Sequence, residues 1–223
     1  ANEAQQSVFR SMSKLNIKNP IWLTKRNVNG QEEQIRTEFA LFGAKLYKPS
    51  KTFYKQNGNP EICKAVYGYD AAGNLQSLME GGLVKRTYLW GYHRTLPVAV
   101  IEGLDYSGTL SLVGQSTLDE LDRYDWNIPG TLNTIRQKIG NQGLMTSYLY
   151  EPLVGMTKQT RPNGETTSYV YASRKRLSSI IDGEGATVRR FAYHRRGEQD
   201  LSVSFQIAPS YDYNATLSTS ASA

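Results

Sequence analysis

Two histidines, one cysteine and a few carboxylate clusters are the residues of this 223-residue chain whose chemistry suits catalysis or metal binding. His93 and His194 each precede an arginine at the end of an aromatic segment, and no Gly-x-Ser-x-Gly turn is present to expose a serine nucleophile. A cysteine-based zinc site needs several thiolates, and Cys63 is the only cysteine. We therefore expect no catalytic residue, no metal site and no cofactor, and interpret Cys63 as a small buried apolar residue of a strand.

Two acidic segments are better explained by local structure than by metal binding. Asp119, Glu120 and Asp122 fit the acidic first turn of a helix capped by Ser116, where the helix dipole favours negative charge. The segment Asp182–Gly185 is typical of a turn, and it lacks the alternating acids of an EF-hand calcium loop. Neither segment therefore predicts a cation site.

A row of aromatic residues offers a different chemistry. Tyr88, Trp90 and Tyr92 alternate along a predicted strand, so their side chains share one face, and Arg94 follows. Packing within the protein is the first interpretation of such rings. The alternative is glycan binding, because exposed rings offer flat apolar faces to sugars while arginine hydrogen-bonds to hydroxyls. These four residues are the candidate ligand-binding residues.

A strand–turn–strand unit positions these rings, and its clearest copy is the segment 66–75. Tyr67 and Tyr69 lie two residues apart, so both point to one face of a strand. Asp70 ends the strand and can hydrogen-bond to the backbone of the turn. Gly73 and Asn74 tolerate the positive φ that a tight turn requires, and Leu75 begins the return strand.

The aromatic pair recurs at a nearly constant spacing. Tyr67 and Tyr69 have counterparts 21 residues later at Tyr88 and Trp90. The same offset separates Tyr148 and Tyr150 from Tyr169 and Tyr171, and a pair at Phe191 and Tyr193 follows. A period of this length fits two strands and two turns, and each unit must stack on its neighbours to bury its aromatic face. The repeat-defining residues are Tyr67, Tyr69, Asp70, Gly73, Asn74, Leu75, Tyr148, Tyr150, Tyr169, Tyr171, Leu177 and Tyr193.

Four segments follow from the patterns along the chain. Residues 1–101 are expected to hold an N-terminal helix, over 3–15, and β-hairpins, with a break in the strand pattern at 47–50. A short helical insertion follows at 102–141, with helices over 117–124 and 131–139 and Gly140 ending the second. Hairpin repeats resume at 142–197. The last segment, 198–223, combines one alternating strand over 201–207 with a tail rich in Ser, Ala and Thr.

Composition excludes several classes of function. The net charge is +6, but the basic residues are scattered except for clusters at 174–176 and 189–196. These clusters lie on predicted hairpin turns and strand ends, where charge discourages edge pairing, so we expect no nucleic-acid partner. No apolar run approaches the roughly 20 residues of a membrane span, so we expect no membrane insertion. The first residues lack the basic and apolar regions of a signal peptide.

The repeat residues resemble those of the Rhs/YD-repeat proteins. Their repeat reads approximately Tyr-x-Tyr-Asp-x-x-Gly-Arg/Asn-Leu, and the segment 67–75 is similar at every fixed position. The segments 88–92 and 152–171 look like the form found in large Bacteroidetes surface proteins. After Tyr171 the pattern departs, because Ala172 stands in place of Asp and Lys175 in place of Gly. That hairpin is therefore expected to turn differently.

The resemblance implies a fold, a function and a location. The expected fold is mainly β: an antiparallel β-hairpin ribbon, forming a curved or spiralling sheet, with the short helical insertion and the N-terminal helix. The expected function is a non-catalytic scaffold segment of a large secreted or cell-surface bacterial protein. Its partners would be neighbouring repeats or domains of the parent chain, or a second copy of the chain through exposed strand edges. Part of a toxin-encapsulating shell and a carbohydrate-binding module that contacts a surface glycan are the two alternatives.

Overall fold

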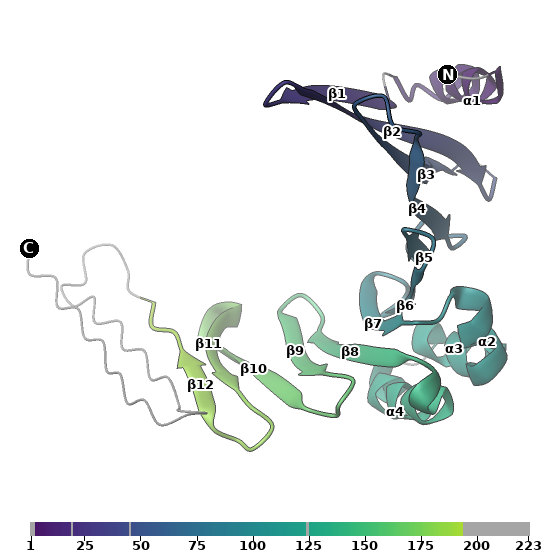
Figure 1. Ribbon diagram of the computed structural model, residues 1–223. Helices are drawn as coiled ribbons and strands as arrows, with labels where there is room; N and C mark the ends of the chain where they lie inside the picture. The colour runs from purple at the N-terminus through teal and green to yellow at the C-terminus, as the bar shows by residue number, and fades with distance from the viewer. Residues whose placement is uncertain (1–2, 19, 45, 124, 194–223) are drawn as a thin grey trace, which may run out of the picture. The chain divides into compact units, whose positions relative to one another are not determined.

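A computed structural model describes residues 3–18, 20–44, 46–123 and 125–193 (Figure 1). The fold is mainly β, as predicted, and the chain divides into two compact units, Ala1–Leu144 and Met145–Ala223. Within each unit, consecutive strands pair antiparallel in chain order. The strand predicted over 201–207, the tail and His194 lie outside the described residues.

The first unit holds all of the α-helices in the described part of the chain. Its elements are α1 (Glu3–Lys14), β1 (Leu23–Val28), β2 (Gln31–Phe42), β3 (Leu46–Gln56), β4 (Ile62–Tyr69), β5 (Leu75–Glu80), β6 (Val84–Gly91), β7 (Leu96–Glu102), α2 (Tyr106–Val113), α3 (Gln115–Arg123), η1 (Asp125–Asn127), α4 (Ile128–Ile139) and η2 (Gly140–Gln142). None of the helices in the described residues is long and apolar enough to cross a membrane.

The second unit is built from hairpins. Its elements are β8 (Leu144–Glu151), which begins at the boundary residue, then β9 (Gly155–Thr160), β10 (Thr166–Ala172), η3 (Ser173–Lys175), β11 (Arg176–Ile181) and β12 (Thr187–Arg190). Strand β12 closes the hairpin repeats that were expected over 142–197. The segment η3 lies where the repeat pattern departs, and Arg174 and Lys175 adopt φ of 70° and 57° there. This hairpin therefore turns differently, as the sequence predicted.

Helix α1 packs on part of strand β2 through an apolar face and through the side-chain amide of Gln5. Met12 is fully buried, and the ring of Phe9 meets Phe39 edge to face at 6.1 Å between centroids. The Gln5 side chain donates to the Phe39 carbonyl and accepts from the Phe39 N–H, both at 2.9 Å. Strand β1 pairs with β2 only up to Arg36, so the Gln5 amide supplies the partner that a neighbouring strand would supply at Phe39.

The break predicted at 47–50 is wrong. Strand β3 runs through this segment and includes Pro49, which faces Phe39 of β2. The pairing shifts register between Glu38 and Phe39, next to the proline. Proline has no N–H to donate, and a bulge removes the need for one, so a single proline does not end the strand here.

One five-residue turn occurs three times, at 70–74, 161–165 and 182–186. In each copy the first residue donates its N–H to the carbonyl of the fifth, at 2.8 to 3.0 Å, and accepts from the N–H of the fourth, at 3.0 to 3.3 Å. The fourth residue is always glycine, with φ of 89°, 88° and 89°. An L side chain rarely adopts this conformation, so the turn requires glycine at that position. The positive φ of this turn thus explains why glycine occupies position 73.

Aspartate strengthens two of these turns. Asp70 Oδ1 accepts from the Asn74 N–H at 2.7 Å, and Asp182 Oδ1 accepts from the N–H groups of Glu184 and Ala186 at 3.0 and 2.8 Å. The Asp182 carboxylate is therefore used as a hydrogen-bond acceptor for the backbone of its own turn. Asn74 also donates its side-chain amide to the Arg94 carbonyl at 2.8 Å, which ties this turn to the turn after β6.

The repeated tyrosines connect neighbouring strands. The Tyr67 hydroxyl lies 3.2 Å from Thr52 Oγ1 of β3, and the Tyr171 hydroxyl donates to the Met156 carbonyl of β9 at 2.9 Å. The Tyr69 ring meets Phe42 edge to face at 4.9 Å. The Tyr169 hydroxyl of β10 donates to Gln159 Oε1 of β9 at 3.4 Å, and Tyr193, which follows β12, is 50% exposed. The hydroxyls of Tyr67, Tyr169 and Tyr171 thus have partners on a neighbouring strand, and the Tyr69 ring packs on an aromatic neighbour.

The helical insertion builds the main core of the first unit. Helices α2, α3 and α4 pack on one another, and α2 and α3 pack on β6. The side chains that are fully or almost fully buried in this region are Thr87, Leu89, Val98, Ala99, Ile101, Thr109, Val113, Leu121, Ile128, Thr131, Leu132, Ile135 and Ile139. The helices lie inside the predicted insertion at 102–141, and Gly140 ends α4 as predicted.

Several details of the sequence prediction are wrong. Helix α2 was not predicted, and α3 begins at Gln115, so Ser116 lies inside the helix instead of capping it. Helix α4 begins at Ile128, because Pro129 fits the first turn of a helix, where its missing N–H has no intrahelical partner. Cys63 is exposed, not buried, because it lies in the accessible first part of β4.

The turn at 182–186 predicts a contrast between two neighbouring substitutions. Asp182→Ala removes the acceptor of two backbone N–H groups, so we expect it to lower the free energy of unfolding by about 1 to 2 kcal/mol. Glu184→Ala in the same turn removes an exposed side chain and should change stability by less than about 0.5 kcal/mol. Urea unfolding measures both. If added calcium chloride stabilised the wild type but not Asp182→Ala, the carboxylate would instead be a cation ligand.

A buried hydroxyl in α2 predicts a stabilising substitution. Among the described residues, Thr109 Oγ1 is a buried side-chain oxygen without a hydrogen-bond partner. Thr109→Val keeps the shape and removes the desolvated hydroxyl, so we expect stability to rise by about 1 kcal/mol. Thr131→Val is the matched control, because its equally buried hydroxyl donates to Glu120 Oε2 at 3.1 Å, and this variant should lose stability. Equal losses in the two variants would contradict the assignment.

Candidate functional site

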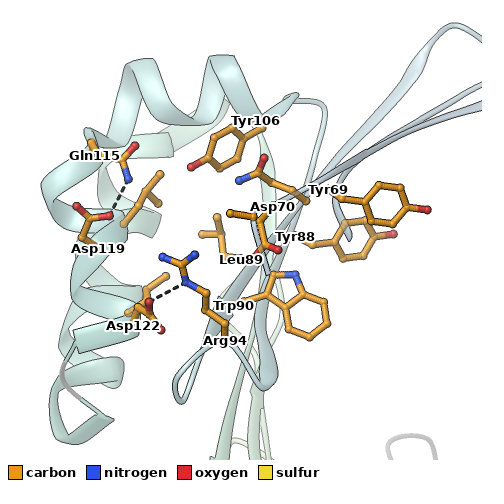
Figure 2. Close-up of a pocket in the computed structure, with 14 residues that line it drawn as sticks. Tyr69, Asp70, Tyr88, Leu89, Trp90, Arg94, Tyr106, Gln115, Asp119 and Asp122 are labelled. Atoms are coloured by element: carbon orange, nitrogen blue, oxygen red, sulfur yellow. Dashed lines mark hydrogen bonds and ion pairs between the residues drawn. The ribbon is translucent and has the colours of Figure 1, made fainter. Parts of the chain in front are cut away.

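A cavity of about 340 Å³ lies between the sheet and the helices of the first unit (Figure 2). Three groups of residues line it: the turn after β4 with β5, strand β6 with its following turn, and helices α2 and α3. The lining residues are Tyr69, Asp70, Ala71, Gln76, Tyr88, Leu89, Trp90, Arg94, Tyr106, Gln115, Leu118, Asp119, Leu121 and Asp122.

Strand β6 separates two kinds of side chain at this cavity. Leu89 is buried and points toward the helices, whereas the ring of Tyr88 points away from them, as does that of Tyr69 (Figure 2). Gly91 ends the strand with no room for a side chain, because a Cβ there would lie 2.9 Å from Val98 Cγ1 and 3.1 Å from the Leu121 carbonyl. The glycine thus lets α3 approach β6 closely enough to form the cavity wall.

A left-handed turn after β6 brings Arg94 to the cavity. Tyr92, His93 and Arg94 adopt φ of 51°, 56° and 60° in succession, and the Thr95 N–H donates to the Gly91 carbonyl at 3.1 Å. The Thr95 hydroxyl also donates to the Tyr92 carbonyl, at 2.5 Å. A positive φ is unfavourable for each of these three non-glycine residues by about 1 kcal/mol. Strain of this kind persists where the surrounding contacts hold it.

The turn holds Arg94 against an acid of helix α3. Arg94 Nε donates to Asp122 Oδ2 at 2.7 Å, and the guanidinium points into the space between β6 and α3 (Figure 2). The hydrogen bond and charge of Asp122 raise the pKa of Arg94, and the charges of Asp70 and Asp119 add to this. Arg94 therefore stays charged, and about half of its side chain remains accessible.

The helices supply the remaining polar groups. Gln115 donates its side-chain amide to Asp119 Oδ1 at 2.7 Å (Figure 2). Burial raises the pKa of the Tyr106 phenol, and the charge of Asp119 raises it further, so this hydroxyl stays neutral and can both donate and accept. The prediction that Asp119 and Asp122 form an acidic first turn is wrong, because α3 begins at Gln115 and Asp122 lies in its last turn.

The structure separates the four candidate ligand-binding residues. Tyr88, Trp90 and Arg94 line the cavity, whereas Tyr92 is only 8% exposed and does not. The Trp90 indole N–H donates to the Leu75 carbonyl at 2.7 Å, so this ring also joins β6 to β5. Positive φ at Tyr92 turns the chain away from strand geometry, which breaks the predicted alternation. The four residues therefore do not form one flat row.

Sequence reasoning missed the helical side of the cavity. Tyr106, Gln115 and Asp119 come from helices whose starts were not predicted, and Gln76 lies in β5 without any motif. One signal was present for α2, because Asp105 precedes it as an N-cap and accepts from the Gly108 N–H at 2.9 Å.

The remaining candidates within the described residues, His93 and Cys63, do not meet in a site. His93 lies in the left-handed turn and is exposed, and Cys63 lies on β4. In the described part of the chain, no three His, Cys, Asp or Glu residues are grouped so that they could hold a metal ion.

Comparisons with known proteins give a limited result. No family model and no curated protein matches this sequence. Among the solved structures that match is the Tc holotoxin pore of Photorhabdus luminescens, with 8% sequence identity and a TM-score of 0.39. The match covers 71% of this chain and 8% of the pore chain, so this chain spans less than a tenth of that protein's length.

The cap of α2 predicts a pH dependence of stability. Asp105 accepts from Lys85 Nζ at 2.8 Å and from the Gly108 N–H, and these bonds lower its pKa to about 2 from the usual 3.8. Because the folded state holds the charged form, the stabilisation is complete above about pH 4 and is lost as the pH falls toward 2. We expect the wild type to lose more stability over this range than Asp105→Asn.

Chemical unfolding of both proteins between about pH 5 and pH 2 tests this expectation. Lys85→Met is the control, because removing the main cause of the shift should reduce the pH dependence in a protein that still has Asp105. Parallel pH profiles for the wild type and Asp105→Asn would contradict the assignment.

Proposed function

We propose that the chain is a non-catalytic β-repeat scaffold segment of a large secreted or cell-surface bacterial protein of the Rhs/YD-repeat type. The observation that carries the proposal is the recurrence of one five-residue turn, with the same hydrogen bonds and the same left-handed glycine, at 70–74, 161–165 and 182–186. Gly73 of the YD pattern is at the position where this turn requires glycine, and Asp70 is at the position where an aspartate side chain adds a further hydrogen bond. In this proposal the repeat residues maintain the shape of the chain.

The use of charged groups supports a scaffold role. Arg36 on β2 pairs with Glu38 and Glu61, each at 2.6 Å, and its guanidinium lies 4.1 Å from the centre of the Phe53 ring. The hydrogen bond from Arg36 lowers the pKa of Glu61. These groups join β2, β3 and the start of β4, so the shifted pKa reflects a cross-strand ion pair and not a reactive group.

The outer strands indicate where neighbouring repeats would bind. Among the described residues, β1 pairs only with β2 and β12 only with β11. An outer strand presents N–H and C=O groups to any further strand. We infer that neighbouring repeats or domains of the parent chain, or a second copy of this chain, pair with these edges.

An immunoblot of fractionated source cells with an antibody against this segment tests the proposal. We expect a band far above the 25.0 kDa of this chain, in the secreted or outer-surface fraction. Cytoplasmic and surface marker proteins, blotted on the same fractions, are the controls. A band near 25 kDa in the cytoplasmic fraction would contradict both the large parent protein and the surface location.

A further inference from the structure

We propose that the cavity between the turn 70–74, the turn 92–94 and helix α3 binds one residue of a neutral sugar. The proposal does not depend on the scaffold function, since it concerns the helical insertion and not the repeats. The ligand class follows from the charges, the hydrogen-bonding groups and the volume of the cavity.

The charged groups around the cavity disfavour an anion, and each of them already has a partner within the protein. Three carboxylates line it, from Asp70, Asp119 and Asp122, so an anionic ligand would be repelled. Arg94 points into the same space, where it pairs with Asp122, and Asp119 and Asp70 accept hydrogen bonds from the Gln115 amide and the Asn74 N–H. Because Arg94 already pairs with Asp122 at 2.7 Å, a ligand has no strong ionic partner to gain. A neutral polar ligand is not repelled by the carboxylates and needs no ionic partner.

The hydrogen-bonding groups are of both kinds, as hydroxyl groups require. Gln76, Gln115 and Tyr106 each carry donors and acceptors, and the carboxylate of Asp119 only accepts. Arg94 uses Nε for Asp122, and its other N–H groups extend the set of donors. A sugar hydroxyl donates one hydrogen bond and accepts others, so a ring with several hydroxyls matches this mixture.

The cavity also offers some apolar surface, from β6 and from α3. This surface is small: Leu89 of β6 and Leu118 and Leu121 of α3 line the cavity, and they are 4%, 9% and 1% exposed. The C–H face of a sugar ring can pack on such surface while its hydroxyls reach the polar groups. Protein pockets for small ligands range from about 300 to 1,000 Å³. A cavity of about 340 Å³ therefore suits one sugar residue better than a long oligosaccharide.

The polar groups are held in place before any ligand binds. Asp70 is fixed by the Asn74 N–H, and the Asn74 side chain donates to the Arg94 carbonyl at 2.8 Å. The left-handed turn fixes Arg94 itself. Groups that are already ordered lose little entropy on binding. This ligand position differs from the aromatic row of the sequence prediction, because Tyr92 is not part of it.

Two neighbouring turn residues provide a matched pair of variants. Ala71 and Ala72 are both exposed in the same turn, but only Ala71 lines the cavity. Ala71→Trp should obstruct the cavity, and Ala72→Trp should leave it open. Binding is measured by NMR titration of the whole chain with the methyl α-glycosides of glucose, galactose and mannose. Glucuronate and glucosamine serve as the anionic and cationic probes.

We expect at least one neutral glycoside to bind with a Kd on the order of 1 mM or below, and more tightly than either charged probe. Ala71→Trp should weaken binding by about tenfold or more, and Ala72→Trp by less than about twofold. Tyr106→Phe, which removes one hydroxyl and no volume of the ring, should weaken it about threefold to tenfold, and it serves if Ala71→Trp does not fold. Ser107→Ala is its control, because this exposed neighbour does not line the cavity.

Three results would overturn the proposal. The first is that none of the three neutral glycosides binds. The second is that binding is unchanged in both Ala71→Trp and Tyr106→Phe, which would place the sugar elsewhere. The third is tighter binding of glucosamine or glucuronate, which would make the cavity an ion site.

Discussion

Burial of strands β6 and β7 beneath the helical insertion is the interaction on which the first unit depends. The described side chains with almost no accessible surface concentrate there, among them Val98, Ile101, Ile128 and Ile135. Strands β2 to β5 carry mostly half-buried side chains instead. Since burial of apolar surface is the main favourable term in folding, the helices provide a core that the open hairpins of this unit lack. The cavity lies at the edge of this core, so buried side chains such as Leu89 and Leu121 hold its walls in place.

Local chemistry explains which parts of the fold were predictable from the sequence. The turns at 70–74 and 182–185 were identified because glycine and asparagine tolerate positive φ and aspartate hydrogen-bonds to adjacent backbone. The cause and the effect lie within a few residues in each case. The α4 stop at Gly140 was predictable for the same reason.

Features that depend on a partner elsewhere in the chain were not predictable. Pro49 indicated a break, but the register shift at Phe39 on the facing strand accommodates it. Helix α2 is apolar on most sides because it packs among other elements, so it lacks the periodicity that identifies a surface helix. The cavity joins residues from four separate segments of the chain. Only Tyr88, Trp90 and Arg94 were candidates from the sequence, because they lie close together in one predicted hairpin.

The repeated tyrosines show how a large aromatic content is used without a deep core. The rings of Tyr67, Tyr69 and Tyr171 each contact an adjacent strand or loop and keep the hydroxyl near a partner or solvent. A half-buried ring gains apolar contact without the cost of an unsatisfied hydroxyl. This accounts for tyrosine, and not phenylalanine, at most of the repeat positions.

The self-contained turn has a consequence for how such a chain can change over evolutionary time. All of the backbone donors and acceptors that define it come from five consecutive residues. A duplicated hairpin therefore contains all of the residues that its turn needs, and no compensating substitution in a distant strand is required. The helical insertion is different, since Gly91 must match Val98 and Leu121. The chain can consequently be lengthened by duplication of whole hairpins. In the helical insertion and the strands it covers, by contrast, residues in contact must change together.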